Sequence, residues 1–419
     1  MVRSILWVVN VPLPEYSHMV GLKVCNFGGW LLNASSYLSK SSGFRLSISF
    51  PDYSLKPGET KIVVGEHITY YAFGKFDIKD HTIVNDVIRD SKADVVHVFG
   101  TELEHSYSFS LESRKLNIES VVSIQGLVSV ISKHVSTRVP KIMQFPFTFR
   151  SLIRGDSING LRALYSRRGE YEKNTLRLSG NVIGRTDWDK ACVELINPQA
   201  NYFHVNETLR PTFYEKLWDI DLVQKRSIFV SQGNMPFKGL NVVLEAMALL
   251  TGKYPDLRLY LAGTDPTRSK CKLKYVTMTS YGAYLDWLIS KLNIRSNVVF
   301  LGNISESDYV DRLTRSHVFV SASSIENSPN SVCEAMLVGT PVISSFVGGV
   351  SSLCEHKKSA MLYQHNAEYM LANYISEVFE NDDLALSLSY HAKEKAKVTH
   401  DIPRNGADLI EVYETILRN

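Results

Sequence analysis

Two carboxylates stand eight positions apart in the segment SSIENSPNSVCEAMLVGTPVISSFVGG, residues 323–349. Glu326 precedes a Ser-Pro-Asn-Ser turn, and Glu334 follows by about one turn of the helix that this motif should open. A helix N-terminus offers unpaired N–H groups and a positive dipole end, which bind phosphate. An anion site between two acids suits a ligand with a central diphosphate and a sugar at each end, such as a nucleotide-sugar. The alternative is that Glu334 is only a first-turn acid favoured by the dipole.

The sequence between the two acids carries the signals of a short helix. Pro329 suits the first helical turn, where its missing N–H costs nothing. Asn330 and Ser331 are residue types that cap a helix, and Gly339 is placed to end it. The amides of Asn330, Ser331 and Val332 are therefore the expected phosphate ligands.

A second loop supplies a cation. The strand expected at 227–230 is followed by Ser-Gln-Gly-Asn-Met-Pro-Phe-Lys-Gly, which contains Gly233 and Asn234 and ends in Lys238 at a helix start. A lysine ammonium binds phosphate as a point charge. At about 4 Å and an effective dielectric constant of about 20, the gross attraction is about 4 kcal/mol. This loop predicts phosphate binding by Lys238; the alternative is an exposed lysine at a helix start.

Other turns follow expected strands, at the edge of an open α/β sheet where ligands bind. Gly28-Gly29 lies after a long loop and just before a helix, and Gly263-Thr264 and Gly302-Asn303 end two strands of the C-terminal half. Glycine lets a backbone approach a ligand closely, but each of these turns alone is equally well explained by turn chemistry.

Polar residues also end three strands of the N-terminal half. Candidates for binding a second substrate at these strand ends are Glu102, His105, Gln125 and Arg185. The alternatives are that His105 is a surface histidine and that Asp187, just after Arg185, is only a helix N-cap.

Residues 323–349 resemble the E-x7-E signature of retaining group 1 (family 4-like) glycosyltransferases with the GT-B fold. The resemblance covers Glu-Ala-Met at 334–336, Gly-Thr-Pro-Val-Ile at 339–343 and the Gly-Gly turn at 348–349. It implies an α/β protein with two Rossmann-like, doubly wound domains that face a cleft. The usual aromatic-glycine pair after the first Glu is replaced by Asn-Ser-Pro-Asn, which looks like a sub-branch that makes bacterial surface polysaccharides.

The resemblance also implies roles for the donor-side residues. Glu334 would accept hydrogen bonds from ribose hydroxyls, and Glu326 from hydroxyls of the transferred sugar. Gly28-Gly29 lies where the family's Gly-Gly pair meets the donor phosphate or the acceptor. The turns at Gly263-Thr264 and Gly302-Asn303 look like the family's base- and ribose-side loops.

Two positions depart from the family pattern. Asn234 stands where an Arg usually binds the phosphates together with a Lys, so the second cation is missing from its usual place. Gln125 stands where many relatives carry a His, which leaves the catalytic base unassigned. The proton acceptor expected from the family is an oxygen of the donor phosphate.

The expected function is that of a retaining glycosyltransferase that moves a sugar from a UDP- or GDP-sugar to a glycan or lipid-linked glycan acceptor. Capsule, O-antigen or exopolysaccharide synthesis is the expected setting. No cofactor and no metal are expected, since the Asp-x-Asp at 187–189 lies in the acceptor-side domain. The alternatives are a non-catalytic nucleotide-sugar-binding subunit and a GT-B nucleotide-sugar epimerase. A nicotinamide dehydrogenase is disfavoured because no G-x-G-x-x-G follows the first strand.

Strand-like apolar runs alternate with helical segments, as in doubly wound α/β domains. We expect strands at 5–9, 46–50, 95–99, 121–124, 182–183, 227–230, 257–262, 298–301, 318–321 and 342–344, and helices at 30–41, 239–252, 284–292, 305–315, 331–338 and 405–417. The domains are predicted at 1–205 (acceptor side) and 206–400 (nucleotide-sugar side). The helix in 401–419 is expected to return to the first domain, as in the family.

Composition and charge narrow the setting. The 419 residues allow two domains, and a net charge of +3 gives no reason to expect nucleic acid as a partner. Between residues 133 and 190, however, 12 Lys/Arg face 5 Asp/Glu and alternate with aromatic residues. This stretch indicates peripheral contact with an anionic membrane or a phosphate-bearing acceptor; a solvated basic face is the alternative.

The cysteines and the N-terminus indicate the compartment. Five cysteines, at 25, 192, 271, 333 and 354, form no C-x-x-C pair, which favours a reducing compartment without disulfides or a zinc site. The first apolar run is too short for a signal peptide or a membrane span. We therefore expect a cytoplasmic protein, at most peripheral to the inner face of the membrane.

Overall fold

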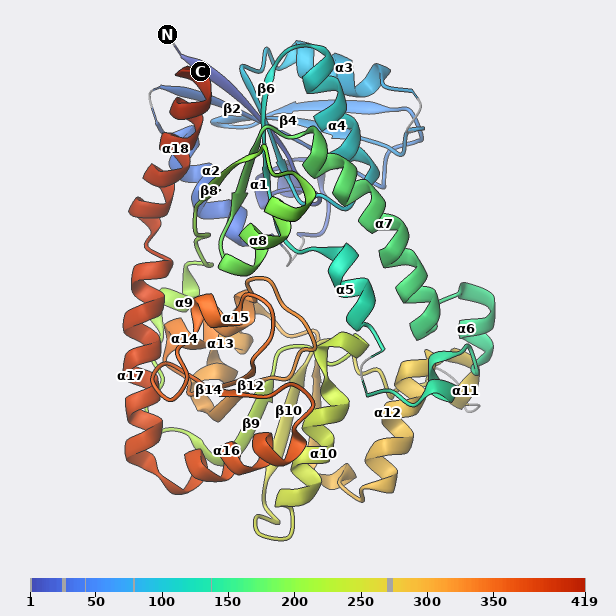
Figure 1. Ribbon diagram of the computed structural model, residues 1–419, viewed down its shortest axis with the longest axis vertical. Helices are drawn as coiled ribbons and strands as arrows, with labels where there is room; N and C mark the ends of the chain where they lie inside the picture. The colour runs from blue at the N-terminus through green and yellow to red at the C-terminus, as the bar shows by residue number, and fades with distance from the viewer. Residues whose placement is uncertain are drawn as a thin grey trace. The chain divides into compact units, whose positions relative to one another are not determined.

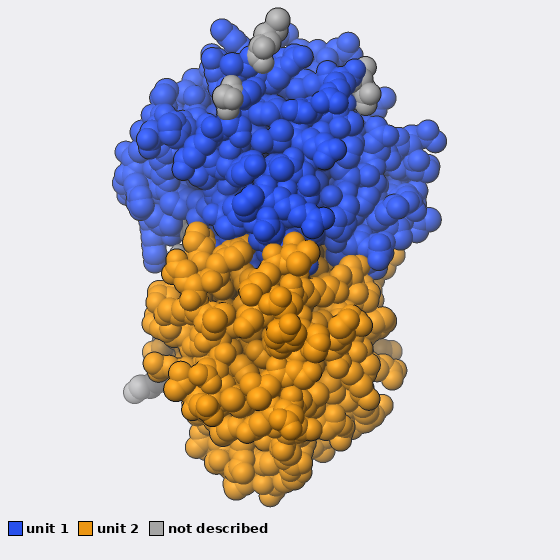
Figure 2. All heavy atoms as spheres, turned by 90° about the vertical axis from the view of Figure 1, so that its left-hand side faces the viewer, with its two compact units in different colours: residues 1–129, 167–210, 399–419 blue, residues 130–166, 211–398 orange. Residues whose placement is uncertain are grey.

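The computed structural model describes residues 2–24, 28–41, 43–77, 80–136, 138–269 and 274–418. The chain divides into two units (Figure 2). Unit 1 comprises residues 1–129, 167–210 and 399–419, and unit 2 comprises residues 130–166 and 211–398. Of the five cysteines, Cys25 and Cys271 lie outside the described residues. Cys192, Cys333 and Cys354 form no disulfide among the described residues.

Unit 1 is built on an eight-stranded sheet in the order β3-β4-β2-β1-β5-β6-β7-β8, with only β3 antiparallel to its neighbour. The strands are β1 Arg3–Val8, β2 Phe44–Pro51, β3 Thr60–Val64, β4 Ile68–Phe73, β5 Val95–Phe99, β6 Glu119–Ser123, β7 Asn181–Gly184 and β8 Asn201–His204. The central strands have continuous apolar sequences because helices cover both faces of a parallel sheet and bury the side chains on each side.

The helices of unit 1 come from all three of its segments, so the last helix of the chain belongs to the same unit as the first (Figure 1). They are α1 Pro14–Val20, α2 Trp30–Ser39, α3 Thr82–Asp90, α4 Glu104–Lys115, α8 Asp187–Ile196 and α18 Ile402–Arg418. The last helix packs on α2. Its Tyr413 hydroxyl accepts a hydrogen bond from Trp7 Nε1 at 2.8 Å and lies 2.5 Å from His97 Nδ1, so the C-terminal helix is part of the core of unit 1.

Unit 2 carries a six-stranded, all-parallel sheet in the order β11-β10-β9-β12-β13-β14. Its strands are β9 Gln224–Val230, β10 Arg258–Ala262, β11 Val298–Gly302, β12 Ser316–Ser321, β13 Val342–Ser345 and β14 Met361–Tyr363. Its helices are α9 Thr212–Glu215, α10 Leu240–Leu250, α11 Lys274–Thr277, α12 Ser280–Lys291, α13 Glu306–Arg315, α14 Asn330–Val338, α15 Val350–Leu353, α16 Glu368–Glu380 and, up to the return to unit 1, α17 Asp382–Thr399.

Residues 130–166 correct the predicted domain division. The predicted N-terminal domain includes them, but they belong to unit 2. This segment contains η1 Lys141–Gln144, α6 Phe149–Arg154 and the first part of α7 Ile158–Leu178. α5 Val128–His134 leads into this segment, which we call the arm. Arg138 ties it to α10 and α16 through Glu245, at 2.9 Å, and Glu368. The division between the units falls after Arg210 and before Thr399, not after residues 205 and 400.

Some strands were not predicted. β3 is exposed at the sheet edge and β8 is only four residues long, so neither shows the buried apolar run that reveals a parallel strand. β4 and β14 were missed as well, although both are buried.

Candidate functional site

Helix α14 begins one position earlier than predicted. Pro329 is its N-cap in extended backbone, Asn330 is the first helical residue, and Gly339 ends the helix with φ 91°. The predicted N-cap roles of Asn330 and Ser331 are therefore wrong, because Pro329 already occupies that position. The N–H groups of Val332 and Cys333 both donate to the Pro329 carbonyl, at 3.0 and 3.2 Å.

This hydrogen bonding changes which amides can receive an anion. Val332 was predicted as a phosphate ligand, but its N–H is already engaged within the first turn. The amides of Asn330 and Ser331 precede that bond and keep the orientation of a helix N-terminus. Glu334 lies one turn further on and is buried, with 9% of its surface exposed.

Lys238 and Glu326 form an ion pair. Lys238 Nζ lies 2.6 Å from Glu326 Oε1, and the Ser323 hydroxyl donates to the same oxygen at 2.6 Å. Both charged side chains are mostly buried, with 26% and 13% of the side chain exposed. An ammonium has three N–H donors, so this contact leaves two of them for other oxygens. The sequence predicted both residues but not that they touch, and it did not find Ser323.

Two glycines allow the loops of this cluster to approach each other. Lys238 ends the turn η2 Pro236–Lys238, and Gly239 follows with φ 71°. A Cβ on Gly239 would lie 1.9 Å from the Ala322 carbonyl oxygen. A Cβ on Gly348, with φ 49°, would lie 2.0 Å from the Glu326 carbonyl oxygen, which accepts a hydrogen bond from Gly349 at 3.0 Å. Any side chain at either position would displace Lys238 or Glu326.

The other predicted loops of unit 2 lie at the ends of strands. Gly233 packs against Leu240, and Asn234 accepts a hydrogen bond from Gln232 Nε2 at 2.9 Å. Asn234 therefore lies in the loop that leads to Lys238, but it carries no charge.

The turns after β10 and β11 are joined to each other. The Gly263 N–H donates to the Gly302 carbonyl at 2.8 Å, and the Thr264 hydroxyl lies 3.5 Å from Asn303 Oδ1. Both glycines have positive φ, and open space surrounds the position of a Cβ on each. The sequence predicted these turns separately, and the structure pairs them.

In unit 1, Gly28-Gly29 precedes α2 as predicted. Gly28 has φ 78°, and Gly29 is the N-cap of the helix. A Cβ on Gly29 would lie 2.4 Å from the Cγ and Cδ atoms of Arg210. The glycine therefore makes room for an arginine side chain that the sequence reasoning did not single out. Nothing in the motif itself points to Arg210, which is far away in sequence.

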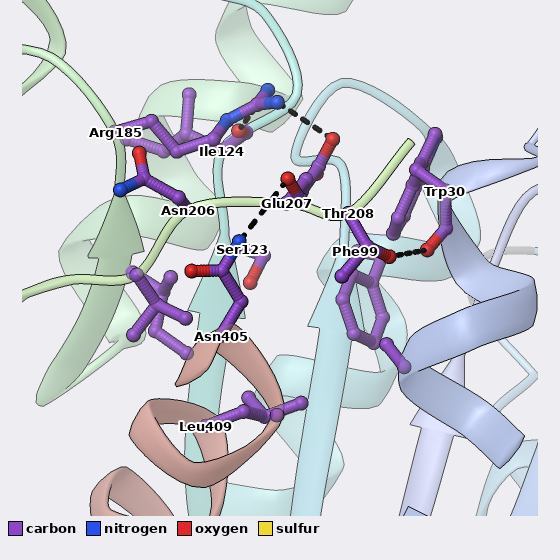
Figure 3. Close-up of a pocket in the computed structure, with 14 residues that line it drawn as sticks. Trp30, Phe99, Ser123, Ile124, Arg185, Asn206, Glu207, Thr208, Asn405 and Leu409 are labelled. Carbon is purple, nitrogen blue, oxygen red and sulfur yellow. Dashed lines mark hydrogen bonds and ion pairs between the residues drawn. The ribbon is translucent and has the colours of Figure 1, made fainter. Parts of the chain in front are cut away.

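Gln125 and Arg185 both contact Glu207, a residue that was not predicted. Gln125 Nε2 donates to Glu207 Oε1 at 2.6 Å. An Arg185 guanidinium nitrogen lies 2.6 Å from Glu207 Oε2 (Figure 3). His400 Nδ1 binds the Glu207 backbone carbonyl at 2.6 Å. An ionised carboxylate can only accept hydrogen bonds, so the Gln125 amide nitrogen, not its oxygen, faces Glu207.

A small cavity lies beside this cluster. Trp30, Phe99, Glu207 and Leu409 are among the residues that line it, and its volume is about 40 Å³. A space of that size could admit water but is too small for a sugar. All the residues that line it belong to unit 1, and none of the residues predicted to bind the donor in unit 2 is among them.

His105 and Glu102 lie at the start of α4 and just before it. His105 is buried, so the alternative interpretation of a surface histidine is wrong. Its Nε2 lies 2.9 Å from Asn10 Oδ1. Burial lowers the pKa of His105 to about 4, so the ring is neutral at pH 7. Burial raises the pKa of the Glu102 carboxyl.

A third acid, Glu172 on α7, was not predicted. Its carboxylate accepts the N–H of Val128 at 2.5 Å and that of Ser129 at 3.3 Å, at the start of α5. Burial raises the pKa of Glu172 to about 7, and the nearby Glu102 contributes to the rise.

The Asp-x-Asp at 187–189 has a structural role. Thr186 is the N-cap of α8, and its hydroxyl and the Asp189 carboxylate form a capping box, so Asp187 is not the cap. Asp189 also accepts a hydrogen bond from Tyr202 at 2.5 Å. In the part of the chain that the structure describes, no group of three or more His, Cys, Asp or Glu side chains is arranged to hold a metal ion.

The part of the chain that matches a known family lies in unit 2. Residues 215–395 match glycosyl transferases group 1. That region, which is less than half of the chain, contains Lys238, Glu326 and Glu334. A curated relative, the D-inositol 3-phosphate glycosyltransferase of Corynebacterium urealyticum, is 24% identical over 185 residues, which are 43% of this chain and 40% of the relative. The chain spans about half of the length of the curated relatives that it matches.

Solved structures show the fold of the chain. Sucrose-phosphate synthase of Thermosynechococcus elongatus has a TM-score of 0.67 at 15% identity and covers 99% of both chains. Anabaena HepE, in complex with UDP and glucose, has a TM-score of 0.67 at 14% identity over 99% of this chain and 100% of its own. These similarities establish two parallel-sheet α/β domains of the GT-B type. No helix in the described ranges is both long and apolar enough to cross a membrane.

Proposed function

We propose that this protein is a retaining glycosyltransferase that uses a UDP- or GDP-sugar as donor and a glycan or lipid-linked glycan as acceptor. The observation that carries the proposal is the Lys238–Glu326 ion pair, which lies within the region similar to group 1 glycosyltransferases, as does the N-terminal turn of α14. UDP bound to HepE supports a nucleotide donor.

The donor would be held by groups of unit 2. Lys238 would keep Glu326 as a partner and use its remaining N–H groups on the diphosphate. The amides of Asn330 and Ser331 would complete the anion site, and Glu334 would bind the ribose hydroxyls. Negative charge grows on the departing diphosphate during transfer, so these contacts strengthen toward the transition state and accelerate the reaction.

Glu326 and unit 1 would handle the two sugars. Glu326 would accept hydrogen bonds from the transferred sugar, and Gln125 is a candidate for binding the acceptor. No metal is required by this scheme, and a phosphate oxygen of the donor would take the acceptor proton. We place the reaction in surface-polysaccharide synthesis at the cytoplasmic face of the membrane.

A screen of nucleoside diphosphates and their sugars by thermal shift tests the donor. UDP, GDP or one of their sugars should raise the melting temperature, and incubation with the matching nucleotide-sugar should release the nucleoside diphosphate. Proton NMR of the product should show the anomeric configuration of the donor. An inverted product would contradict the retaining mechanism, and binding without any release would favour a non-catalytic subunit.

A further inference from the structure

The arm carries a concentration of exposed apolar side chains. Of the 22 large hydrophobic side chains that are exposed among the described residues, six lie within the twelve positions 142–153. They are Ile142, Phe145, Phe147, Phe149, Leu152 and Ile153, and each exposes between 41% and 75% of its surface. Single exposed hydrophobic residues are ordinary, whereas a cluster of this size marks an interaction site.

The backbone beneath these side chains is held by polar contacts. The Ser151 hydroxyl accepts the N–H of Ser280 at 3.0 Å and donates to Asp156 at 2.8 Å, while the Phe147 N–H donates to the Ser280 hydroxyl at 3.3 Å. Within α6 the serine is buried, and Phe149 and its apolar neighbours face solvent. This polarity is the reverse of that of a helix that packs on a protein core.

Basic residues accompany the apolar ones. Between residues 138 and 168 the chain has seven Lys/Arg and one Asp. Arg138 and Arg150 are paired with acids, whereas Lys141 and Arg154 are exposed on either side of the apolar cluster. The helix α12, which contacts η1, carries an exposed Trp287 with Lys291 Nζ 4.8 Å from its ring. Aromatic rings beside cations are typical of the interfacial region of a bilayer.

We propose that residues 141–154 form a membrane-docking surface that inserts Phe145, Phe149 and Leu152 among the headgroups of an anionic bilayer, with Lys141 and Arg154 on lipid phosphates. Apolar insertion supplies affinity, and the cations select an anionic surface. This inference extends the lipid-linked acceptor of the proposed function, but its test uses no nucleotide and no acceptor.

Flotation of the full chain with vesicles tests the surface. Vesicles that contain 30% phosphatidylglycerol should carry the protein at low salt, and those of phosphatidylcholine alone should carry far less. Raising the salt to about 0.5 M should release it, since charge attraction is screened. The proposal would be overturned if the wild-type protein did not float with anionic vesicles, or if it bound neutral vesicles equally well.

Variants locate the contact. Phe149→Ser with Leu152→Ser should lower the bound fraction at least tenfold, and Lys141→Glu with Arg154→Glu should lower it by about fivefold per cation. The matched control is Leu195→Ser on α8 in unit 1, which removes a side chain that is 87% exposed. Wild-type flotation of the Phe149/Leu152 variant would refute the surface, whatever the outcome for glycosyl transfer.

Two further measurements separate competing explanations. The variants should keep the melting temperature and any nucleoside diphosphate affinity of the wild type, because the changed side chains are exposed. Sedimentation of the wild type should show a monomer. A dimer that the Phe149/Leu152 variant dissociates would make this face a self-interface and would contradict membrane docking.

Discussion

At the scale of single residues, the proposed donor site depends first on the ion pair between Lys238 and Glu326. The ammonium and the carboxylate are 2.6 Å apart and are both shielded from solvent, so each holds the other in place before any ligand arrives. Removal of one leaves the other charge without its partner in a partly buried position, which costs more than loss of an exposed pair.

Lys238→Ala should lower kcat/KM for the nucleotide-sugar by about ten- to several-hundred-fold, which corresponds to the loss of one to a few kcal/mol of transition-state stabilisation. The measurement is release of nucleoside diphosphate from the matching donor. Lys253→Ala is the control, because Lys253 pairs with Glu380 on an exposed surface of the same unit. Wild-type turnover in the Lys238 variant would remove this residue from the phosphate site.

Glu207→Ala should destabilise unit 1 strongly. The guanidinium of Arg185 is 5% exposed and would lose its carboxylate, at a cost of about 3–5 kcal/mol. Calorimetry should show a lower melting temperature, with Glu411→Ala, an exposed acid on α18, as the control. Equal melting temperatures for the two variants would show that Glu207 is not a structural partner of Arg185.

At the scale of elements, the loop before α10 and the loop before α14 must approach closely for Lys238 to reach Glu326. Gly239 makes this approach possible for two reasons. Its φ of 71° is left-handed, and the Ala322 carbonyl oxygen occupies the space where the Cβ of any other residue would lie. The first turn of α14 then presents the amides of Asn330 and Ser331.

Gly239→Ala should therefore displace the loop that bears Lys238 and lower both the melting temperature and the affinity for nucleoside diphosphate. Gly252→Ala is a matched control, since Gly252 has no positive φ and a Cβ there meets nothing within 4 Å. Thermal shift with and without ligand measures both effects. Equal behaviour of the two variants would contradict the close approach described above.

The elements that the sequence predicts well are those with strong local signals. The strands β5, β9 and β12 are buried apolar runs, and α14 ends at Gly339 as expected from its position. The start of α14 was displaced by one residue because Pro329 is compatible with both the N-cap and the first turn. The assignment of residues 130–166 to unit 2 depends on Arg138 and its distant partners, and no local pattern encodes such contacts.

The candidate site shows the same limit. Residue type and position after a strand pointed to Lys238, Glu326 and Gln125. They could not reveal that Lys238 binds Glu326, or that Gln125 meets Arg185 through Glu207, because those pairs are 88 and 82 positions apart. Glu207 follows β8, which is only four residues long and was not predicted. A search for polar residues after predicted strands therefore could not find Glu207.

For the whole molecule, four buried histidines govern the response to acid. Burial lowers the pKa of His97 to about 3 and those of His105, His317 and His400 to about 4. Between about pH 6.5 and pH 4 these four histidines bind protons in the unfolded chain but not in the folded chain, so their contribution lowers the stability as the solution is acidified. The raised pKa of Glu172 acts in the opposite direction, but it is one group against four.

The melting temperature should fall steadily from pH 6.5 to pH 4, and His317→Gln should make the dependence shallower. A glutamine cannot titrate, and its side-chain oxygen can still accept the Arg226 N–H that His317 Nδ1 accepts at 3.2 Å. His18→Gln, at an exposed histidine, is the control. The same slope in the His317 variant and the wild type would show that this imidazole is not held neutral.

Calorimetric titration of UDP and GDP into the wild type, Lys238→Ala and Glu334→Ala tests the central claim most directly. One of the two nucleotides should bind the wild type with a stoichiometry of one, and each substitution should weaken that binding at least tenfold, while Lys253→Ala should not change it. Binding of undiminished affinity in both the Lys238 and the Glu334 variant, or no binding of either nucleotide to the wild type, would contradict a donor site formed by this ion pair and α14.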